Sequence, residues 1–164
     1  MAKELKYLII HFSLTHEGKD FPVEEIARWH TAPPPAGNGW SRPGYSDVFH
    51  LDGSISNMTP FNTDNKVDPW EISYGAAGQN AHSRHICYIG GLREEVIDEH
   101  WEPADTRTDD QKYALEVYVR YMILRHPHIK VGGHNQFAKR VCPGFDVPKW
   151  LREIGVPENN IYEG

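Results

Sequence analysis

Two short runs of apolar residues constrain the fold of this chain more than any other feature. The first occupies residues 6–11, Lys-Tyr-Leu-Ile-Ile-His, and the second occupies residues 86–89, Ile-Cys-Tyr-Ile, just before Gly90 and Gly91. Continuous runs of this length favour strands with both faces buried, as in the centre of a sheet that helices cover. We therefore expect two central strands, the first of which ends at His11.

Three other segments have the periodicity of helices. Residues 22–30 carry a proline and two acidic residues in the first turn, and residues 108–125 begin with Thr108 and Gln111 at capping-box spacing. A third helix is expected over residues 147–154. The apolar face of the longest helix is predicted to contain Ala114, Val117, Tyr118, Tyr121 and Met122.

Turn signals divide the rest of the chain into shorter strands and loops. Asp52-Gly53 favours a tight turn between two strands. The remaining strands are expected at residues 45–51, 54–58 and 129–131, and long loops at residues 33–43 and 59–80. Strands interleaved with helices predict an α/β fold, in which helices flank a mixed central β-sheet. A length of 164 residues fits one domain over residues 1–164.

Composition argues against several classes of protein. The net charge of -6 argues against a nucleic-acid binder, because such proteins usually present a basic surface. No stretch approaches the roughly 20 apolar residues of a membrane helix. The first apolar run is too short for the core of a signal peptide, so we expect synthesis in the cytoplasm without an export signal. Two cysteines cannot form a disulfide framework, whereas ten histidines make a metal site worth seeking.

A histidine and a cysteine near the carboxyl end of the chain are the best candidates for metal ligands. His134 directly follows a predicted strand, and Cys142 lies eight positions later, so the two can converge if the loop between them turns back. Imidazole and thiolate are both good zinc ligands, and His11, at another strand end, is a natural third. The spacing alone is also compatible with purely structural histidines.

Several segments, in their order and spacing, resemble one family over nearly the whole chain. They are Leu8-Ile9-Ile10-His11, Arg28-Trp29-His30, Gly39-Trp40, Gly44-Tyr45, Asp52-Gly53, Gly78-Gln79-Asn80, Ile86 to Gly91, Asp105-Thr106-Arg107-Thr108 with Gln111, Gly133-His134 and Cys142-Pro143-Gly144-Phe145-Asp146. The chain is similar to the zinc amidases that include phage lysozyme-like amidases, bacterial N-acetylmuramoyl-L-alanine amidases and peptidoglycan recognition proteins.

The resemblance implies a zinc amidase fold of the peptidoglycan recognition protein type, and a set of site residues. Zn²⁺ would be held by His11, His134 and Cys142, while Tyr45 would orient or deprotonate the water and Arg140 would stabilise the oxyanion. The implied reaction is hydrolysis of the amide between N-acetylmuramic acid and the L-alanine of the stem peptide. Zinc in such sites lowers the pKa of water to about 7 and polarises the carbonyl.

The chain departs from the family pattern at several positions. Arg140 stands where a lysine is commoner, although Lys139 is adjacent. The members closest to phage lysozymes also carry two histidines that do not bind zinc. One would fall on Ser46 and the other within residues 74–77, Tyr-Gly-Ala-Ala, neither of which supplies a histidine. His82 or His85 can compensate only if the fold brings it to the site.

Other candidates have plainer interpretations. Cys87 is expected to be a buried inert thiol. His30 is expected to pack on the inner stripe of its helix, with a position in the substrate groove as the alternative, and Trp40 either stacks on sugar or anchors its loop. His126 and His128 are expected to be exposed. The acidic run Glu94 to Glu99 is predicted to be solvated surface.

The preferred interpretation is an endolysin of a phage or prophage, made without a signal peptide and acting on the cell wall after release. A cytoplasmic amidase that recycles soluble muropeptides fits the same residues. A non-catalytic peptidoglycan-binding module is a second alternative, although Cys142 argues against it. A regulatory role through a protein partner is a third. We expect a monomer that binds peptidoglycan or muropeptide, with no nucleic-acid partner and no membrane insertion.

Overall fold

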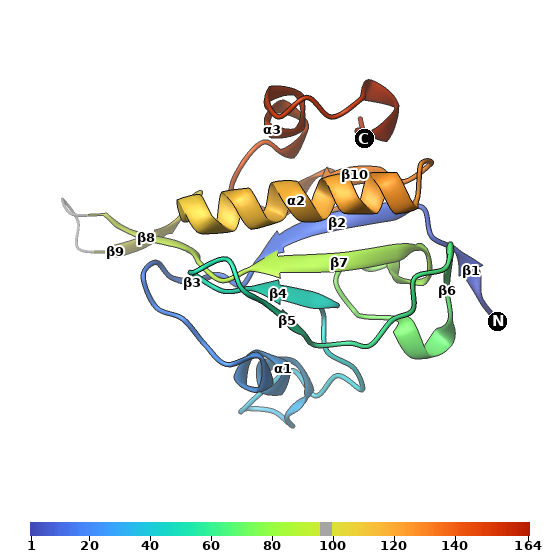
Figure 1. Cartoon of the computed structure of the whole chain (residues 1–164). Helices are drawn as coiled ribbons and strands as arrows, with labels where there is room; N and C mark the ends of the chain where they lie inside the picture. The colour runs from blue at the N-terminus through green and yellow to red at the C-terminus, as the bar shows by residue number, and fades with distance from the viewer. Residues whose placement is uncertain (96–99) are drawn as a thin grey trace.

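The computed structural model describes residues 1–95 and 100–164, and it has helices on both faces of a central sheet (Figure 1). The sheet has the strand order β10-β2-β7-β4-β5. These strands span Lys130–Gly133 (β10), Tyr7–Phe12 (β2), Ser83–Tyr88 (β7), Asp47–Phe49 (β4) and Ile55–Asn57 (β5). The first four are mutually parallel, and β5 pairs with β4 in the antiparallel sense at the edge. The predicted α/β fold with a mixed central sheet is confirmed.

The helices bury the two faces of this sheet separately. Helix α2 (Asp109–Arg125) and helix α3 (Val147–Glu153) cover one face and contribute to the larger core with residues such as Leu115 and Leu151. Helix α1 (Val23–Thr31) covers the other face, where Ile26 packs against Val48 and Cys87. Strands β2 and β7 are therefore buried on both sides, as their apolar runs predict.

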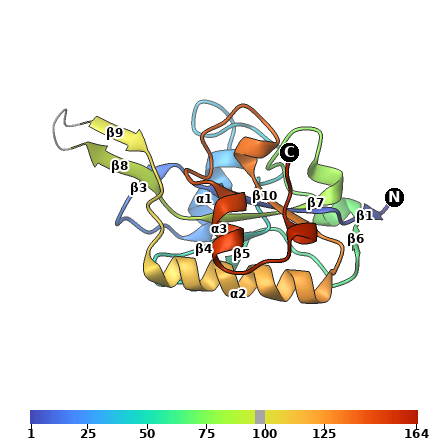
Figure 2. The ribbon, with the colours of Figure 1, turned by 90° about the horizontal axis from the view of Figure 1, so that it is seen from above.

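Shorter elements lie around the sheet. Among the described residues they are β1 (Lys3–Glu4), β3 (Thr15–His16), β6 (Lys66–Val67), β8 (Gly91–Glu95), β9 (His100–Pro103), and the 3-10 helices η1 (Pro69–Glu71), η2 (Asn80–His82), η3 (His134–Gln136) and η4 (Glu158–Asn160). Strand β1 pairs with β6, while β8 lies between β3 and β9 and projects with β9 from the body of the molecule (Figure 2). Within residues 1–95 and 100–164, no helix is long and apolar enough to cross a membrane.

The predicted apolar face of α2 is wrong in part. Met122 is buried as expected, but Val117 and Tyr121 are about half exposed, and the buried positions include Leu115 and Val119 instead. Apolar residues lie on several sides of this helix, so spacing alone does not select the buried one. Contact with the sheet selects it.

One surface prediction also needs correction. His126 is buried, and its Nδ1 forms a 2.7 Å hydrogen bond with Oδ1 of Asn65, whereas His128 is exposed as expected. Glu94 of the acidic run is exposed as expected, within strand β8, and the part of the run that falls on residues 96–99 lies outside the described residues. The predicted loop at residues 59–80 contains β6 and η1.

Candidate metal centre

The carboxyl ends of two neighbouring parallel strands bring His11 and His134 together. His11 is the fifth residue of the six in β2, and His134 follows β10 directly. The strand register sets Gly133 opposite Ile10, so the two histidines leave the sheet at the same edge. Functional side chains collect at such carboxyl ends in sheets of this kind.

Cys142 reaches the same point because the chain turns back after β10. The Asn135 amide donates a 2.8 Å hydrogen bond to the Cys142 carbonyl, which closes the loop. The Phe12 amide then donates to the Cys142 Sγ at 3.3 Å, and the Tyr88 hydroxyl donates to the Pro143 carbonyl at 2.7 Å. The cysteine is therefore held against the end of β2.

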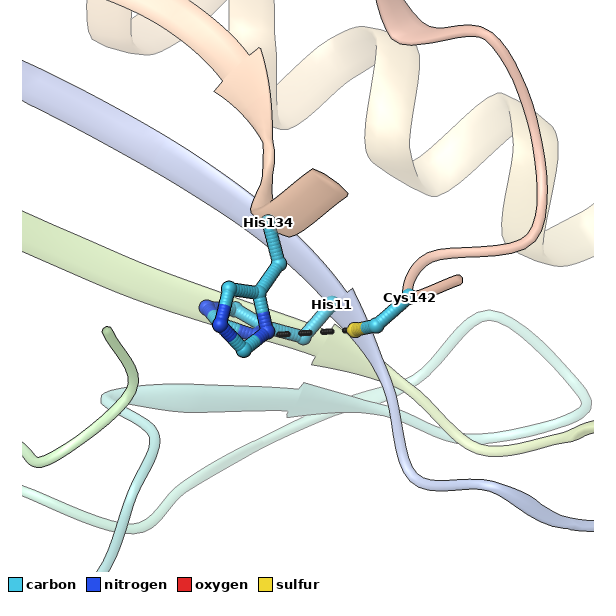
Figure 3. A group of neighbouring side chains, drawn as sticks. All are labelled: His11, His134 and Cys142. Atoms are coloured by element: carbon cyan, nitrogen blue, oxygen red, sulfur yellow. Dashed lines mark hydrogen bonds between the residues drawn. The ribbon is translucent and has the colours of Figure 1, made fainter. Parts of the chain in front are cut away.

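The three side chains converge, as Figure 3 shows. One ligand atom from each of His11, His134 and Cys142 lies within 4.8 Å of the others. The His11 Nδ1 is 3.7 Å from the Cys142 Sγ, and the two imidazole centroids are 4.6 Å apart. In a tetrahedral zinc site, ordinary bond lengths put a nitrogen and a sulfur ligand about 3.6 Å apart. The donor set and the distance between His11 and Cys142 fit zinc.

Burial keeps the candidate ligands in defined protonation states. Burial, and then the neighbouring His85, His134 and His30, hold the pKa of His11 well below its usual value, so its imidazole is neutral. Burial and then Arg140 lower the pKa of His134. Burial raises the pKa of the Cys142 thiol to about 12 in the metal-free chain. Metal binding requires neutral imidazole and thiolate, and a bound cation favours the thiolate strongly.

Behind His11 lies a buried hydrogen-bonded chain that ends at a side-chain amide. His11 Nε2 is 2.9 Å from His85 Nδ1, and His85 Nε2 is 2.9 Å from Asn80 Oδ1. Burial, and then His134, lower the pKa of His85 to about 3. Of the two histidines expected to compensate, His85 is at the site and His82 is not, since the Nδ1 of His82 lies 3.0 Å from the Glu4 carbonyl oxygen instead.

Tyr45 borders the three candidate ligands. Its ring centroid is 5.3 Å from that of His11, and its hydroxyl donates a 3.3 Å hydrogen bond to the Phe12 carbonyl. Burial, and then Cys87 and Cys142, raise the pKa of Tyr45 well above its ordinary value. The hydroxyl is therefore neutral and acts as a hydrogen-bond donor.

A cleft of about 1070 Å³ opens in front of these residues. The exposed residues Arg140 and Lys139 line the cleft, and His30, Trp40 and Tyr74 line it as well. A cleft of this size accommodates a drug-sized or oligomeric ligand fragment. Its wall therefore combines cationic and aromatic side chains around the metal-ligand candidates.

His30 supports the aromatic part of the cleft lining through one hydrogen bond and one ring contact. His30 Nδ1 accepts a 3.0 Å hydrogen bond from the Gly44 amide, and the His30 ring stacks on Trp40 at 5.3 Å between centroids. His30 thus serves both packing and the cleft. Trp40 is 40% exposed, so it anchors its loop and also presents a surface to the cleft.

The two remaining sequence candidates lie outside the cluster. Ser46 is buried with its hydroxyl 3.5 Å from that of Ser73, and it brings no imidazole to the site. Cys87 is fully buried, as expected, and its thiol lies 3.4 Å from the Tyr88 carbonyl. Sequence reasoning did not find the contact of Asn80 with His85, because the pairing depends on how the loop before β7 folds.

Comparison with known proteins agrees with the resemblance seen in the sequence. No family model matches the chain. An endolysin of Enterobacteria phage K11 is 25% identical over 150 residues, which cover 92% of this chain and 87% of that protein.

Solved structures share the fold over nearly the whole chain. The N-acetylmuramoyl-L-alanine amidase LysC from Clostridium intestinale aligns with a TM-score of 0.68 and 20% identity, covering 94% of this chain and 87% of that one. Drosophila PGRP-LB aligns with a TM-score of 0.67 and 19% identity, covering 100% and 91% respectively.

Proposed function

We infer that this chain, a member of the structural superfamily of N-acetylmuramoyl-L-alanine amidases and peptidoglycan recognition proteins, is a zinc-dependent amidase of peptidoglycan. Its substrate is the amide between the lactyl group of N-acetylmuramic acid and the L-alanine of the stem peptide. The observation that carries the proposal is the convergence of two imidazoles and one thiol at the floor of a cleft.

The proposed ligands are His11, His134 and Cys142. Three protein ligands leave the fourth position of a tetrahedral site for water or substrate, as in catalytic zinc sites. A zinc ion supplies Lewis-acid activation of the water and of the scissile carbonyl. A binding module needs no such open set of ligands, so Cys142 supports hydrolysis over recognition alone.

Tyr45 and Arg140 perform the remaining chemistry in this proposal. The Tyr45 hydroxyl orients or deprotonates the water in this proposal, since its ring lies beside that of the proposed ligand His11. When water adds to the carbonyl carbon, the guanidinium of Arg140 donates to the developing oxyanion. The carbon–nitrogen bond then breaks, and the leaving amine of L-alanine takes up a proton that the water released.

The relatives support a role in lysis. The protein of phage K11 is an endolysin, and one of the solved structures is a complex of peptidoglycan recognition proteins with tracheal cytotoxin. We propose that residues 1–164 act as one monomeric catalytic domain. It is made in the cytoplasm and acts on the wall after release. Recycling of soluble muropeptides is the second candidate, since a cleft of about 1070 Å³ is large enough for a fragment of the wall.

Zinc content and lysis together test this proposal. Native protein, Cys142→Ala and the matched control Cys87→Ala are loaded with zinc, desalted and assayed for metal and for dye release from labelled peptidoglycan. The proposal predicts one zinc and activity in the native chain, one zinc in Cys87→Ala, and the loss of both zinc and activity in Cys142→Ala. Zinc without release from either polymer or soluble muropeptide favours a binding module, and absence of zinc from the native chain contradicts the proposal.

A further inference from the structure

His85 belongs to the metal centre although it is not among the three candidate ligands. It is fully buried on β7, where the strand register pairs Ile9 with His85 and His11 with Cys87. His85 and His11 are thus diagonal neighbours on the same face of adjacent strands. Their rings meet edge to face with centroids 5.0 Å apart.

The hydrogen bonds around His85 have only one consistent direction. Asn80 Oδ1 accepts a 2.9 Å hydrogen bond from the Ala76 amide, so this atom is the carbonyl oxygen of the side chain. An oxygen of this kind cannot donate, and therefore His85 Nε2 donates to it at 2.9 Å. A neutral His85 then presents the lone pair of Nδ1 to His11.

The direction at His85 fixes the tautomer of His11. Because His85 Nδ1 accepts, His11 Nε2 carries the proton and donates across 2.9 Å. The lone pair of His11 is then on Nδ1, the atom that lies 3.7 Å from the Cys142 Sγ. Nδ1 is therefore the nitrogen that faces the candidate ligand Cys142.

The backbone leaves room for this histidine at one glycine. A β-carbon added to Gly75 would lie 2.4 Å from both Cγ and Nδ1 of His85, so the imidazole occupies the space next to that residue. Only a residue without a β-carbon at position 75 leaves the His85 ring in this place.

We propose that His85 and Asn80 are positioning residues that hold His11 in the Nε2–H tautomer and aim its Nδ1 at the metal. This proposal rests on the proposed zinc site. Groups that hydrogen-bond to a ligand histidine set its orientation and basicity, and their loss typically costs about 10- to 100-fold in metal affinity.

Two readouts test the proposal. Long-range ¹H–¹⁵N correlation spectra of the metal-free native chain report the tautomer of each imidazole, and we expect the Nε2–H form for both His11 and His85. The Nδ1–H form of His11 would overturn the proposal.

Zinc affinity, measured by competition with a chromophoric chelator, is the second readout. His85→Phe keeps the ring and removes its nitrogens, and we expect affinity to fall about 10- to 100-fold. His85→Gln restores an acceptor towards His11 and a donor towards Asn80, and we expect most of the affinity to return. His82→Phe is the matched control, because the Nδ1 of His82 lies 3.0 Å from the Glu4 carbonyl oxygen and away from the site, and it is expected to bind zinc like the native chain.

The outcomes separate this inference from the proposed function. Native-like zinc affinity in His85→Phe, or equal losses in His85→Phe and His85→Gln, would refute the positioning role while the zinc site stands. Absence of zinc binding by the native chain would remove the proposed function itself. The cobalt-substituted proteins give an independent check, since the visible bands of cobalt should shift in His85→Phe and not in His82→Phe.

Discussion

Gln111 ties helix α2 to the central sheet, and its replacement by leucine should be among the most destabilising single changes outside the metal centre. Its side chain is fully buried. Its Nε2 donates to the carbonyls of Phe49 at 3.1 Å and Ile89 at 3.0 Å, and its Oε1 accepts from the Thr108 amide at 2.9 Å. One amide thus joins the start of α2 to the chain at the ends of β4 and β7.

The cost of Gln111→Leu follows from what each partner retains. The Phe49 carbonyl still accepts from the Ile89 amide at 3.0 Å, whereas the Ile89 carbonyl loses its donor. A buried polar group left without a partner costs about 1–3 kcal/mol. Loss of the Gln111 half of the capping box costs about 1 kcal/mol more. Leucine regains part of this through its apolar surface, so we expect a net loss of about 2–3 kcal/mol.

Urea unfolding followed by circular dichroism measures this loss. With a slope of about 2 kcal/mol per molar urea, the midpoint should fall by about 1–1.5 M. Val117→Ala, at a half-exposed position on the same helix, is the control and should change stability by about 0.5 kcal/mol or less. A loss below about 1 kcal/mol in Gln111→Leu would show that these hydrogen bonds do not anchor the helix.

Three further predictions concern the cleft and the buried His126. Arg140→Ala should lower kcat about 100-fold with zinc content unchanged, whereas Lys139→Ala should leave kcat near native; equal effects would remove the assigned role of Arg140. If the Trp40 ring stacks on substrate, Trp40→Ala should raise KM for muropeptide about 2- to 10-fold at constant kcat. An unchanged KM would show that the ring only anchors its loop. Burial, and then Arg84 and Arg125, lower the pKa of His126 in the folded state, so the unfolded chain takes up the proton first. Stability should therefore fall as pH drops below about 6.5, less steeply in His126→Gln, and equal slopes in urea titrations would contradict this.

The central strands and the capped helix could be predicted from local sequence. Continuous apolar runs marked β2 and β7, and the pair Thr108 and Gln111 marked the start of α2. The buried side of α2 could not be predicted, because Leu115 and Val119 offer a second apolar stripe and contact with the sheet decides between them. Strands β8 and β9 were not predicted, because their residues are largely polar and exposed and have no apolar pattern.

For the candidate site, the sequence predicted only which residues lie at the ends of strands. His11 and His134 could be assigned to strand ends, but their meeting depends on a register that pairs Gly133 with Ile10. The contact of His85 with His11 depends likewise on strand pairing across 74 positions of the chain. His126 was expected at the surface because it flanks the end of a helix, and its partner Asn65 is distant in sequence. Contacts between residues far apart in the chain leave no local sequence pattern from which they could be predicted.

The chemistry of the products tests the central claim most directly. Purified peptidoglycan is digested with the zinc-loaded native chain, and the released material is assayed for new amino groups, for reducing sugar ends and for mass. The account predicts stem peptides with a free amino group on L-alanine and intact glycan strands, with no increase in reducing ends. Reducing ends without new L-alanine amino groups would identify a glycosidase and contradict the account.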